Sequence, residues 1–316
     1  MTLKFLSFCL LFLAQLWNSY TQSCLSPSGS PVSWWVSLIF PNSVSSGHAY
    51  FDSTFTNSTF NIYQQSPDTL QAALGQTFQQ INSLSLQTLG WNDEMPNGST
   101  SSSKAHSKGV LAYNSNAMQG FFLCHSIPKY PAFLNLNINI SINSGERIYA
   151  QHAFCLSTAS DVLADLITKI LPIKPYLYAN NLNNPQSINN LMTSGQIQSP
   201  DYNSIFTYRN YTVNQTNMKF IFKNGAKNAS IFEDGINNML QSPILAETWG
   251  RPLQAPWCGT YPVGNIANIA LNAQISWKET QDHSKWACAT QNNYCCFGDM
   301  NRMSSQWARG GAFYCL

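Results

Sequence analysis

Residues 281–303 read QDHSKWACATQNNYCCFGDMNRM, and residues 104–114 read KAHSKGVLAYN. Both stretches contain the tripeptide His-Ser-Lys, which places His106 two residues before Lys108 and His283 two residues before Lys285. In a β-strand, side chains two residues apart point to the same face. If each tripeptide opens a strand and two halves of the chain pack together, both histidines and both lysines should meet in one cleft.

This set of side chains suits the cleavage of a phosphodiester. One imidazole can attack phosphorus as a nucleophile while the other protonates the leaving oxygen. Two ammonium groups can stabilise the charge that accumulates on the phosphate oxygens. Because the lysines supply the positive charge that a metal ion supplies in other phosphodiesterases, we expect neither a metal nor another cofactor.

The composition limits the classes of protein that remain. The chain has 316 residues, 44% of them hydrophobic and only 9% charged, with a formal net charge of +2. That much apolar material can form a sizeable core, and the small net charge argues against binding nucleic acid by charge alone. No internal stretch reaches the roughly 18 apolar residues of a membrane-spanning helix, so no membrane partner is expected. The sequence does not indicate an oligomeric state.

The N-terminus indicates export. Lys4 precedes the apolar run 5–17, and polar residues follow it, which is typical of a cleaved signal peptide that we place at residues 1–23. Eight cysteines then remain, an even number that suggests disulfides, and none shows the Cys-x-x-Cys spacing of a zinc ribbon. Six N-glycosylation sequons also fit a secreted or lysosomal glycoprotein. They begin at Asn57, Asn97, Asn139, Asn210, Asn214 and Asn228.

Helix and strand signals alternate along the mature chain, so a mixed α/β fold is expected. Residues 66–84 predict a helix with Ser66 as N-cap and Pro67 in its first turn, and residues 161–171 predict a second helix. Strands are predicted at 32–40 and at 109–113 and 120–124, the last two as neighbours. Further strand-like runs lie at 204–213 and 268–277. A Pro- and Asn-rich stretch at 173–187 marks the boundary between an N-terminal half, 24–175, and a C-terminal half, 176–316.

Several motifs together resemble the deoxyribonuclease II family of the phospholipase D superfamily. They are PVSWWVSLIFP, NDEMP, HSKGVLAY and GFFLCHSIPKYP in the first half, and DHSKWACA, CFGDMNR and RGGAFYCL in the second. The resemblance implies two similar halves, each a mixed β-sheet flanked by helices, that form a pseudo-dimer with one central cleft. It also implies a metal-independent acid endonuclease that cuts DNA to 3′-phosphate ends through a phosphohistidine intermediate.

The resemblance assigns the site residues by position. The two pairs are His106 with Lys108 and His283 with Lys285, to which His125 in CHSIP and Asn301 in GDMN are added. By analogy with the superfamily, His106 is the nucleophile and His283 the general acid. Three tryptophans and two further histidines are expected to be structural, and Asp282 either orients a neighbour or is an exposed carboxylate. These five are Trp34, Trp35, Trp286, His48 and His152.

The resemblance also implies disulfides between Cys24 and Cys155 and between Cys315 and one cysteine of the doublet Cys295–Cys296, of which Cys296 is favoured because it directly precedes FGDMNR. The family pattern gives Cys258 no partner in this chain, and Cys288 is the expected substitute. Cys124 is expected to be a free thiol beside the site.

Some positions depart from the family pattern, such as Ile39 in place of a lysine and Asn114 in place of an aspartate. A second hypothesis therefore stays open: a secreted protein of this fold, weakly active or inactive, that binds DNA or another host or cellular partner without cutting it.

Overall fold

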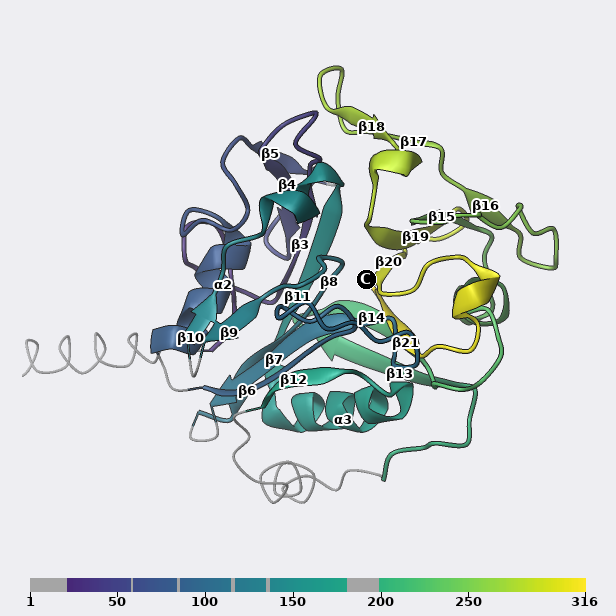
Figure 1. The fold of residues 1–316 in the computed structure, drawn as a ribbon, viewed down its shortest axis with the longest axis horizontal. Coiled ribbons are helices and arrows are strands. Elements are labelled where there is room, and N and C mark those ends of the chain that lie inside the picture. Colours follow the sequence, from purple (N-terminus) through teal and green to yellow (C-terminus); the bar gives the residue numbers. More distant parts are fainter. Residues whose placement is uncertain (1–21, 58, 84–85, 115–116, 135–136, 181–198) are drawn as a thin grey trace, which may run out of the picture.

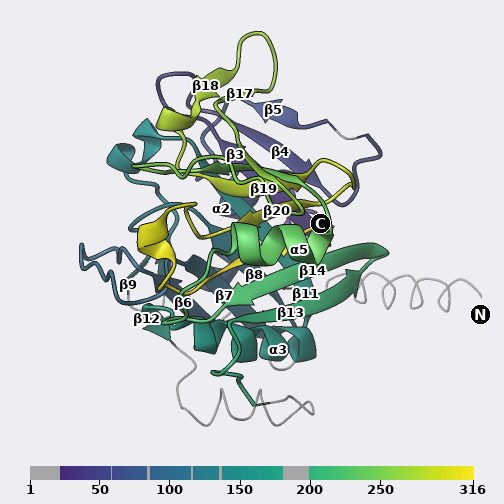
Figure 2. The same cartoon turned by 90° about the vertical axis from the view of Figure 1, so that its right-hand side faces the viewer.

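The computed structural model describes residues 22–316 except 58, 84–85, 115–116, 135–136 and 181–198. Two large β-sheets dominate the described chain (Figures 1 and 2). The mixed α/β class is confirmed, with many more strands than helices. The predicted signal peptide lies outside the described residues apart from Gln22 and Ser23.

The first sheet is built from the N-terminal part of the chain. Its strands in spatial order are β12 (Leu177–Asn180), β6 (Gln87–Asn92), β7 (Lys108–Asn114), β8 (Gln119–His125), β11 (Gln151–Ala159), β3 (Trp34–Ile39), β4 (His48–Asp52) and β5 (Asn61–Tyr63). All neighbouring strands in this sheet are antiparallel. β7 and β8 are the two short apolar runs that the sequence predicts as neighbours. β12 pairs with β6, although it follows residue 175.

The second sheet is built from the C-terminal part of the chain. Its spatial order is β13 (Phe206–Val213), β14 (Thr216–Lys223), β21 (Gly311–Cys315), β20 (Cys295–Gly298), β19 (Lys285–Ala289), β15 (Ile244–Thr248) and β16 (Val263–Asn265). Five strands repeat the topology of the first sheet: the order β15-β19-β20-β21-β14 corresponds to β6-β7-β8-β11-β3. In each series the last strand comes first in the chain and the other four follow in sequence.

Short hairpins complete the strands: β1 (Cys24–Leu25) with β2 (Pro31–Val32), β9 (Ala132–Leu134) with β10 (Asn137–Asn139), and β17 (Asn268–Ala270) with β18 (Ser276–Lys278). The described helices are α2 (Ala73–Ser83), α3 (Ser160–Ile170) and α5 (Asn237–Leu240). Single turns are the 3₁₀ helices η1 (Ser144–Ile148), η2 (Leu171–Ile173), η4 (Glu279–Gln281) and η5 (Ser304–Gln306), and the π-helix η3 (Phe232–Ile236). None of the described helices is long and apolar enough to cross a membrane.

Both predicted helices exist, but the first begins later than expected. α2 starts at Ala73, and Ser66 does not cap it. The Ser66 hydroxyl instead bonds Asp68 and accepts a hydrogen bond from Arg147 at 2.5 Å. Asp68 in turn accepts the backbone N–H of Ile142 at 2.7 Å, so contacts with a distant loop hold residues 66–72 in turns. α3 starts one residue before the predicted position.

The two sheets pack face to face over one continuous apolar core. Aromatic rings from both sheets meet there: Tyr314 of β21 lies 4.8 Å from Phe122 of β8 and 5.0 Å from Phe220 of β14, measured between ring centroids. α3 closes one side of this core, and its Asp165 binds Arg209 and Tyr211 of β13. The relative position of the two sheets is therefore fixed by burial of apolar surface.

Three disulfides are present in the described chain. Cys24–Cys155 and Cys296–Cys315 form as predicted. The predicted Cys258–Cys288 bond is wrong, because Cys288 lies directly opposite Cys295 across the β19–β20 hairpin and bonds it. Cys258 is an exposed free thiol and Cys124 is a buried one.

Candidate active site

The two His-Ser-Lys tripeptides occupy equivalent places, because Lys108 opens β7 and Lys285 opens β19. The histidine before each strand is anchored to the other sheet's part of the chain. The backbone N–H of His106 donates to the carbonyl of Gly310 at 2.9 Å. The backbone N–H of His283 donates to the carbonyl of Ala150 at 2.7 Å. Gly310 directly precedes β21 and Ala150 directly precedes β11, so the two anchors are reciprocal.

The backbone amides of the two lysines are held across the sheets in the same reciprocal way. The Lys108 N–H donates to Oδ1 of Asp299, which follows β20, at 3.4 Å. The Lys285 N–H donates to Nδ1 of His152 on β11 at 3.2 Å. Asp299 also accepts the Ser107 hydroxyl at 2.8 Å. Each tripeptide thus receives its position from a side chain of the opposite sheet.

The first lysine forms a buried ion pair. Lys108 Nζ contacts Asp93 closely and lies 3.8 Å from Glu94, and Arg309 Nη2 contacts the second oxygen of Asp93 at 2.7 Å. Burial alone would raise the pKa of Asp93, but the charges of Lys108, His106 and Arg309 hold it well below its ordinary value. Asp93 is therefore an anion that neutralises much of the charge of Lys108.

The second lysine has different surroundings. Nζ of Lys285 donates to the carbonyl of His283, and no carboxylate of the described residues forms an ion pair with it. Strand register explains the difference: Asn92 pairs with Lys108 and Thr248 with Lys285, so Asp93 in the first sheet corresponds to Trp249 in the second. Burial, together with the nearby Lys108, lowers the pKa of Lys285 to about 7.

Aromatic rings enclose His283. The Tyr149 ring stacks on the imidazole with centroids 5.4 Å apart and planes 23° from parallel. Trp249 meets it edge-on at 4.8 Å, and the Arg251 guanidinium lies over Trp249 at 4.7 Å. Burial lowers the pKa of His283, and the charges of Lys285, Lys108 and His106 lower it further. His283 Nδ1 has no hydrogen-bond partner among the described residues.

The imidazole of His106 is held in one tautomer. Its Nδ1 lies 2.5 Å from the backbone carbonyl oxygen of Asp299. A carbonyl oxygen only accepts hydrogen bonds, so Nδ1 carries the proton and Nε2 keeps its lone pair in the neutral ring. Burial holds the pKa of His106 well below its ordinary value, Lys108 and Lys285 lower it further, and Asp93 opposes them.

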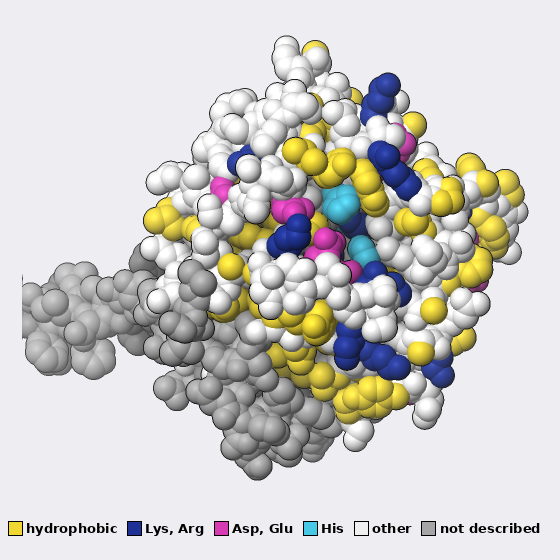
Figure 3. All heavy atoms as spheres, viewed as in Figure 1, with side chains coloured by type: hydrophobic (Ala, Val, Ile, Leu, Met, Phe, Trp, Pro, Cys, Tyr) yellow, Lys and Arg dark blue, Asp and Glu magenta, His cyan; other side chains and the backbone are white. Residues whose placement is uncertain are grey.

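Lys285 lowers the pKa of His106, and Lys108 and His106 lower the pKa of His283, so the two tripeptides lie close to each other. Figure 3 shows histidine side chains in a depression bordered by acidic and basic side chains. His106 and His283 are half-buried, whereas the other three histidines are buried. Both lysines are almost completely buried.

The two additional residues predicted for the site differ in how close they come to it. His125 is fully buried, its Nδ1 accepts the Ile127 N–H at 3.2 Å, and burial together with nearby Lys108 lowers its pKa to about 3. Asn301 is also buried, but none of its described contacts joins its side chain to either tripeptide. Its backbone N–H donates to Gln306 at 2.8 Å, and its Oδ1 has no partner among the described residues.

Sequence reasoning missed four residues that shape the site. Asp93, Asp299 and Arg309 lie inside quoted motifs but received no role, while Trp249 lies outside every quoted motif. Asp282, left open by the sequence, is fully buried and accepts hydrogen bonds from the Ser284 N–H at 2.6 Å and the Trp277 indole at 2.8 Å. It therefore shapes the loop that carries His283.

The described residues contain no group of three or more His, Cys, Asp or Glu side chains arranged to hold a metal ion.

Comparison with known proteins identifies the family. The sequence model for deoxyribonuclease II matches residues 23–316. The chain belongs to the deoxyribonuclease II family. It is 27% identical to mouse deoxyribonuclease-2-beta over 318 residues, which covers 93% of this chain and 87% of the mouse protein. It is 28% identical to rat deoxyribonuclease-2-alpha over 335 residues, covering 97% and 93% of the two chains. Cell death-related nuclease 6 of Caenorhabditis elegans is 27% identical over 333 residues, covering 95% and 85%.

Proposed function

We propose that this deoxyribonuclease II family member is a metal-independent acid endonuclease that cuts DNA phosphodiesters to 3′-phosphate ends. The observation that carries the proposal is the meeting of two His-Ser-Lys tripeptides, each anchored by the opposite sheet, in one hollow. Together they offer two imidazoles for covalent and acid–base catalysis and two ammonium groups for a phosphate.

A phospholipase D-like pseudo-dimer is part of the proposal. Its support is the matched order of five strands in the two sheets and the reciprocal hydrogen bonds at the tripeptides. A pseudo-twofold axis between the sheets relates β7 to β19 and brings the two tripeptides to the same hollow.

In the proposed first step, Nε2 of His106 attacks phosphorus while the bond to O5′ breaks. His283 gives its proton to O5′, so the downstream strand leaves with a 5′-hydroxyl, and the upstream strand stays bound to His106 through its 3′-phosphoryl group as a phosphohistidine. Water then attacks phosphorus, His283 takes a proton from it, and the phosphorus–nitrogen bond breaks to release a 3′-phosphate. Lys108 and Lys285 hold the non-bridging oxygens throughout, and His125 supports Lys108.

Acid conditions favour this cycle. His283 must be protonated to act as an acid, and its surroundings lower its pKa in the free protein. A bound phosphodiester carries negative charge, which raises that pKa again. The partner His106 has to be neutral to attack, so the rate should be bell-shaped in pH with an acidic maximum.

The disulfides and the predicted signal peptide indicate the compartment. Three disulfides are typical of an oxidising compartment. With the predicted signal peptide at 1–23, they support a secreted or lysosomal protein that meets DNA at low pH.

Plasmid nicking tests the activity. Purified protein should nick supercoiled DNA at pH 5 in EDTA, and His106→Ala and His283→Ala should each abolish nicking. Lys129→Ala is the matched surface control, because Lys129 is exposed and its one ion pair among the described residues is with Glu146. A strict requirement for Mg²⁺ would exclude the proposed mechanism. Binding of labelled DNA without any nicking would instead establish the binding-only alternative.

A substrate whose leaving group needs no proton separates the two histidines. On a nitrophenyl phosphodiester, the His283→Ala variant should keep far more activity than His106→Ala, since only the general acid becomes dispensable. Rescue of His106→Ala instead would reverse the two roles. Protein quenched in alkaline denaturant, in which a phosphorus–nitrogen bond survives, should also carry a 3′-phosphoryl DNA strand on His106.

A further inference from the structure

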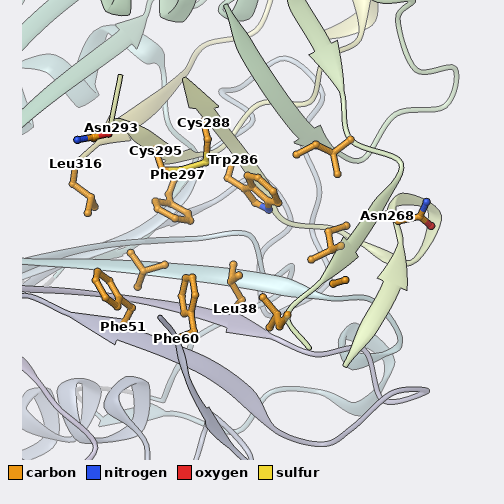
Figure 4. Close-up of a pocket in the computed structure, with 15 residues that line it drawn as sticks. Leu38, Phe51, Phe60, Asn268, Trp286, Cys288, Asn293, Cys295, Phe297 and Leu316 are labelled. Carbon is orange, nitrogen blue, oxygen red and sulfur yellow. A yellow bond between two sulfur atoms is a disulfide. The ribbon is translucent and has the colours of Figure 1, made fainter. Parts of the chain in front are cut away.

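An apolar cavity lies between the two sheets, on the side covered by the β17–β18 hairpin. Its volume is about 560 Å³. In Figure 4, Phe51 and Phe60 lie on one wall, and Trp286 and Phe297 lie on the facing wall. The first pair belongs to the N-terminal sheet region and the second pair to β19 and β20. The mechanism proposed above uses none of these side chains.

The chemistry of the wall defines what the cavity accepts. Aromatic and aliphatic side chains provide nearly all of it, and no Lys, Arg, His, Asp or Glu side chain lines its described part. The hydrogen-bonding side chains are Asn268 at one end, Asn293 at the other, and the Trp286 indole between them (Figure 4). A charged ligand would lose its hydration here without gaining a partner, which is strongly unfavourable.

Size and position select the kind of occupant. Small-molecule sites commonly measure about 300–1,000 Å³ and combine apolar walls with a few polar groups. Strands β3 and β4 bound this cavity on one side and β19 and β20 on the other. An elongated apolar molecule fits this lining if its polar group lies beside the side-chain amide of Asn268 or Asn293.

We propose that this cavity binds an uncharged amphiphile with a long-chain apolar body and a hydroxyl or amide head, such as a neutral monoacyl lipid. The tail packs between Phe51 and Phe60 on one wall and Trp286 and Phe297 on the other. The head takes hydrogen bonds from Asn268 or Asn293. The bound lipid bridges both sheets and stabilises their pairing.

The cavity borders the candidate active site along one strand. Trp286 on its wall directly follows Lys285 in β19. A ligand that packs against Trp286 restrains β19 and with it the position of Lys285. Binding itself does not depend on any activity of the two tripeptides, so its test stands apart from the nuclease assay.

The experiment measures binding of 1-monooleoylglycerol below its aggregation concentration by displacement of the neutral dye Nile red, with thermal unfolding as a second readout. We expect saturable binding at one site and a rise in melting temperature. Ala270→Trp, which places an indole at the cavity wall, should weaken binding at least tenfold. Ala273→Trp is the matched control, because it lies on the same hairpin, is exposed and does not line the cavity.

Oleate at pH 8 serves as the charged comparator and should bind at least tenfold more weakly than the neutral lipid. If Ala270→Trp fails to fold, Leu271→Asp introduces a charge at the same wall and should have the same effect on binding. Equal binding by the Ala270 and Ala273 variants, equal affinity for oleate, or no saturable binding would each overturn the proposal.

Discussion

Replacing Asp93 with asparagine should strongly destabilise the fold. Asp93 is 4% exposed, and its two oxygens pair with Lys108 and Arg309. The Arg309 guanidinium also donates to the carbonyls of Ser101, Lys104 and Ala105, so Asp93 holds the loop before the first tripeptide against the second sheet's chain. Removing one member of a buried ion pair leaves charge without compensation and costs about 3–5 kcal/mol.

The matched control is Glu146→Gln. Glu146 also pairs with a lysine, at 3.1 Å, but the Lys129 side chain is 41% exposed. Exposed ion pairs contribute about 0–1 kcal/mol because water screens them and ordering the side chains costs entropy. Urea unfolding followed by circular dichroism at pH 7 gives both free energies. A loss below about 1 kcal/mol for Asp93→Asn, or equal losses for the two variants, would refute the reasoning.

The pH dependence of the Asp93 effect supplies a second check. The pKa of Asp93 is depressed in the folded state, whereas an unfolded aspartate titrates near pH ~3.9. Folding therefore favours the ionised carboxylate, and its stabilisation is complete above that unfolded pKa. It is lost as the pH falls further toward the folded pKa. The difference between wild type and Asp93→Asn should persist from pH 7 to pH 5 and shrink below about pH 4.

Three further predictions follow from the site and the disulfides. In a His106→Ala background, which does not cut, DNA affinity should fall by about tenfold between pH 6 and pH 8, because Lys285 titrates near pH 7. Lys285→Arg stays charged and should remove most of that dependence, as measured by fluorescence anisotropy. Trp249→Ala should reduce the nicking rate by about tenfold by freeing the His283 ring, and Trp249→Phe should restore part of it. Cys24→Ser should cost about 2–5 kcal/mol in urea unfolding, whereas Cys258→Ser should cost almost nothing.

Each of these three predictions has an outcome that would contradict it. Wild-type affinity that is flat from pH 6 to pH 8 would exclude titration of Lys285 as the cause of weaker binding. Equal nicking by Trp249→Ala and wild type would show that the ring does not position His283. Similar losses of stability for the Cys24 and Cys258 variants would show that loss of the Cys24–Cys155 disulfide does not cause the destabilisation.

Short-range patterns predicted much of the fold. The apolar runs of β7 and β8 and the periodicity of α3 are local signals, and the structure contains all three. The start of α2 was predicted too early, because Ser66 and Asp68 bond to residues that lie 81 and 74 positions away. Local capping rules contain no information about such partners.

The same limit applies to the site. The tripeptides are visible in the sequence because each is compact, whereas the contact between Asp93 and Arg309 spans 216 positions. The asymmetry between Asp93 and Trp249 appears only when strand register aligns the two sheets. Cys288 was assigned to Cys258 because pairing by elimination ignores the hairpin that places Cys295 directly opposite it.

The reciprocal lysine amide bonds limit how this chain can exchange segments with its relatives. Asp299 holds Lys108, and His152 holds Lys285, so each tripeptide depends on a residue inherited with the other sheet. A chimera that joins the N-terminal sheet of one relative to the C-terminal sheet of another keeps both tripeptides intact but mixes their anchors. Such recombinants should be tolerated only between parents whose residues at positions 152 and 299 are compatible with the foreign partner strand. The site therefore stays intact only when both sheets come from one parent or from compatible parents.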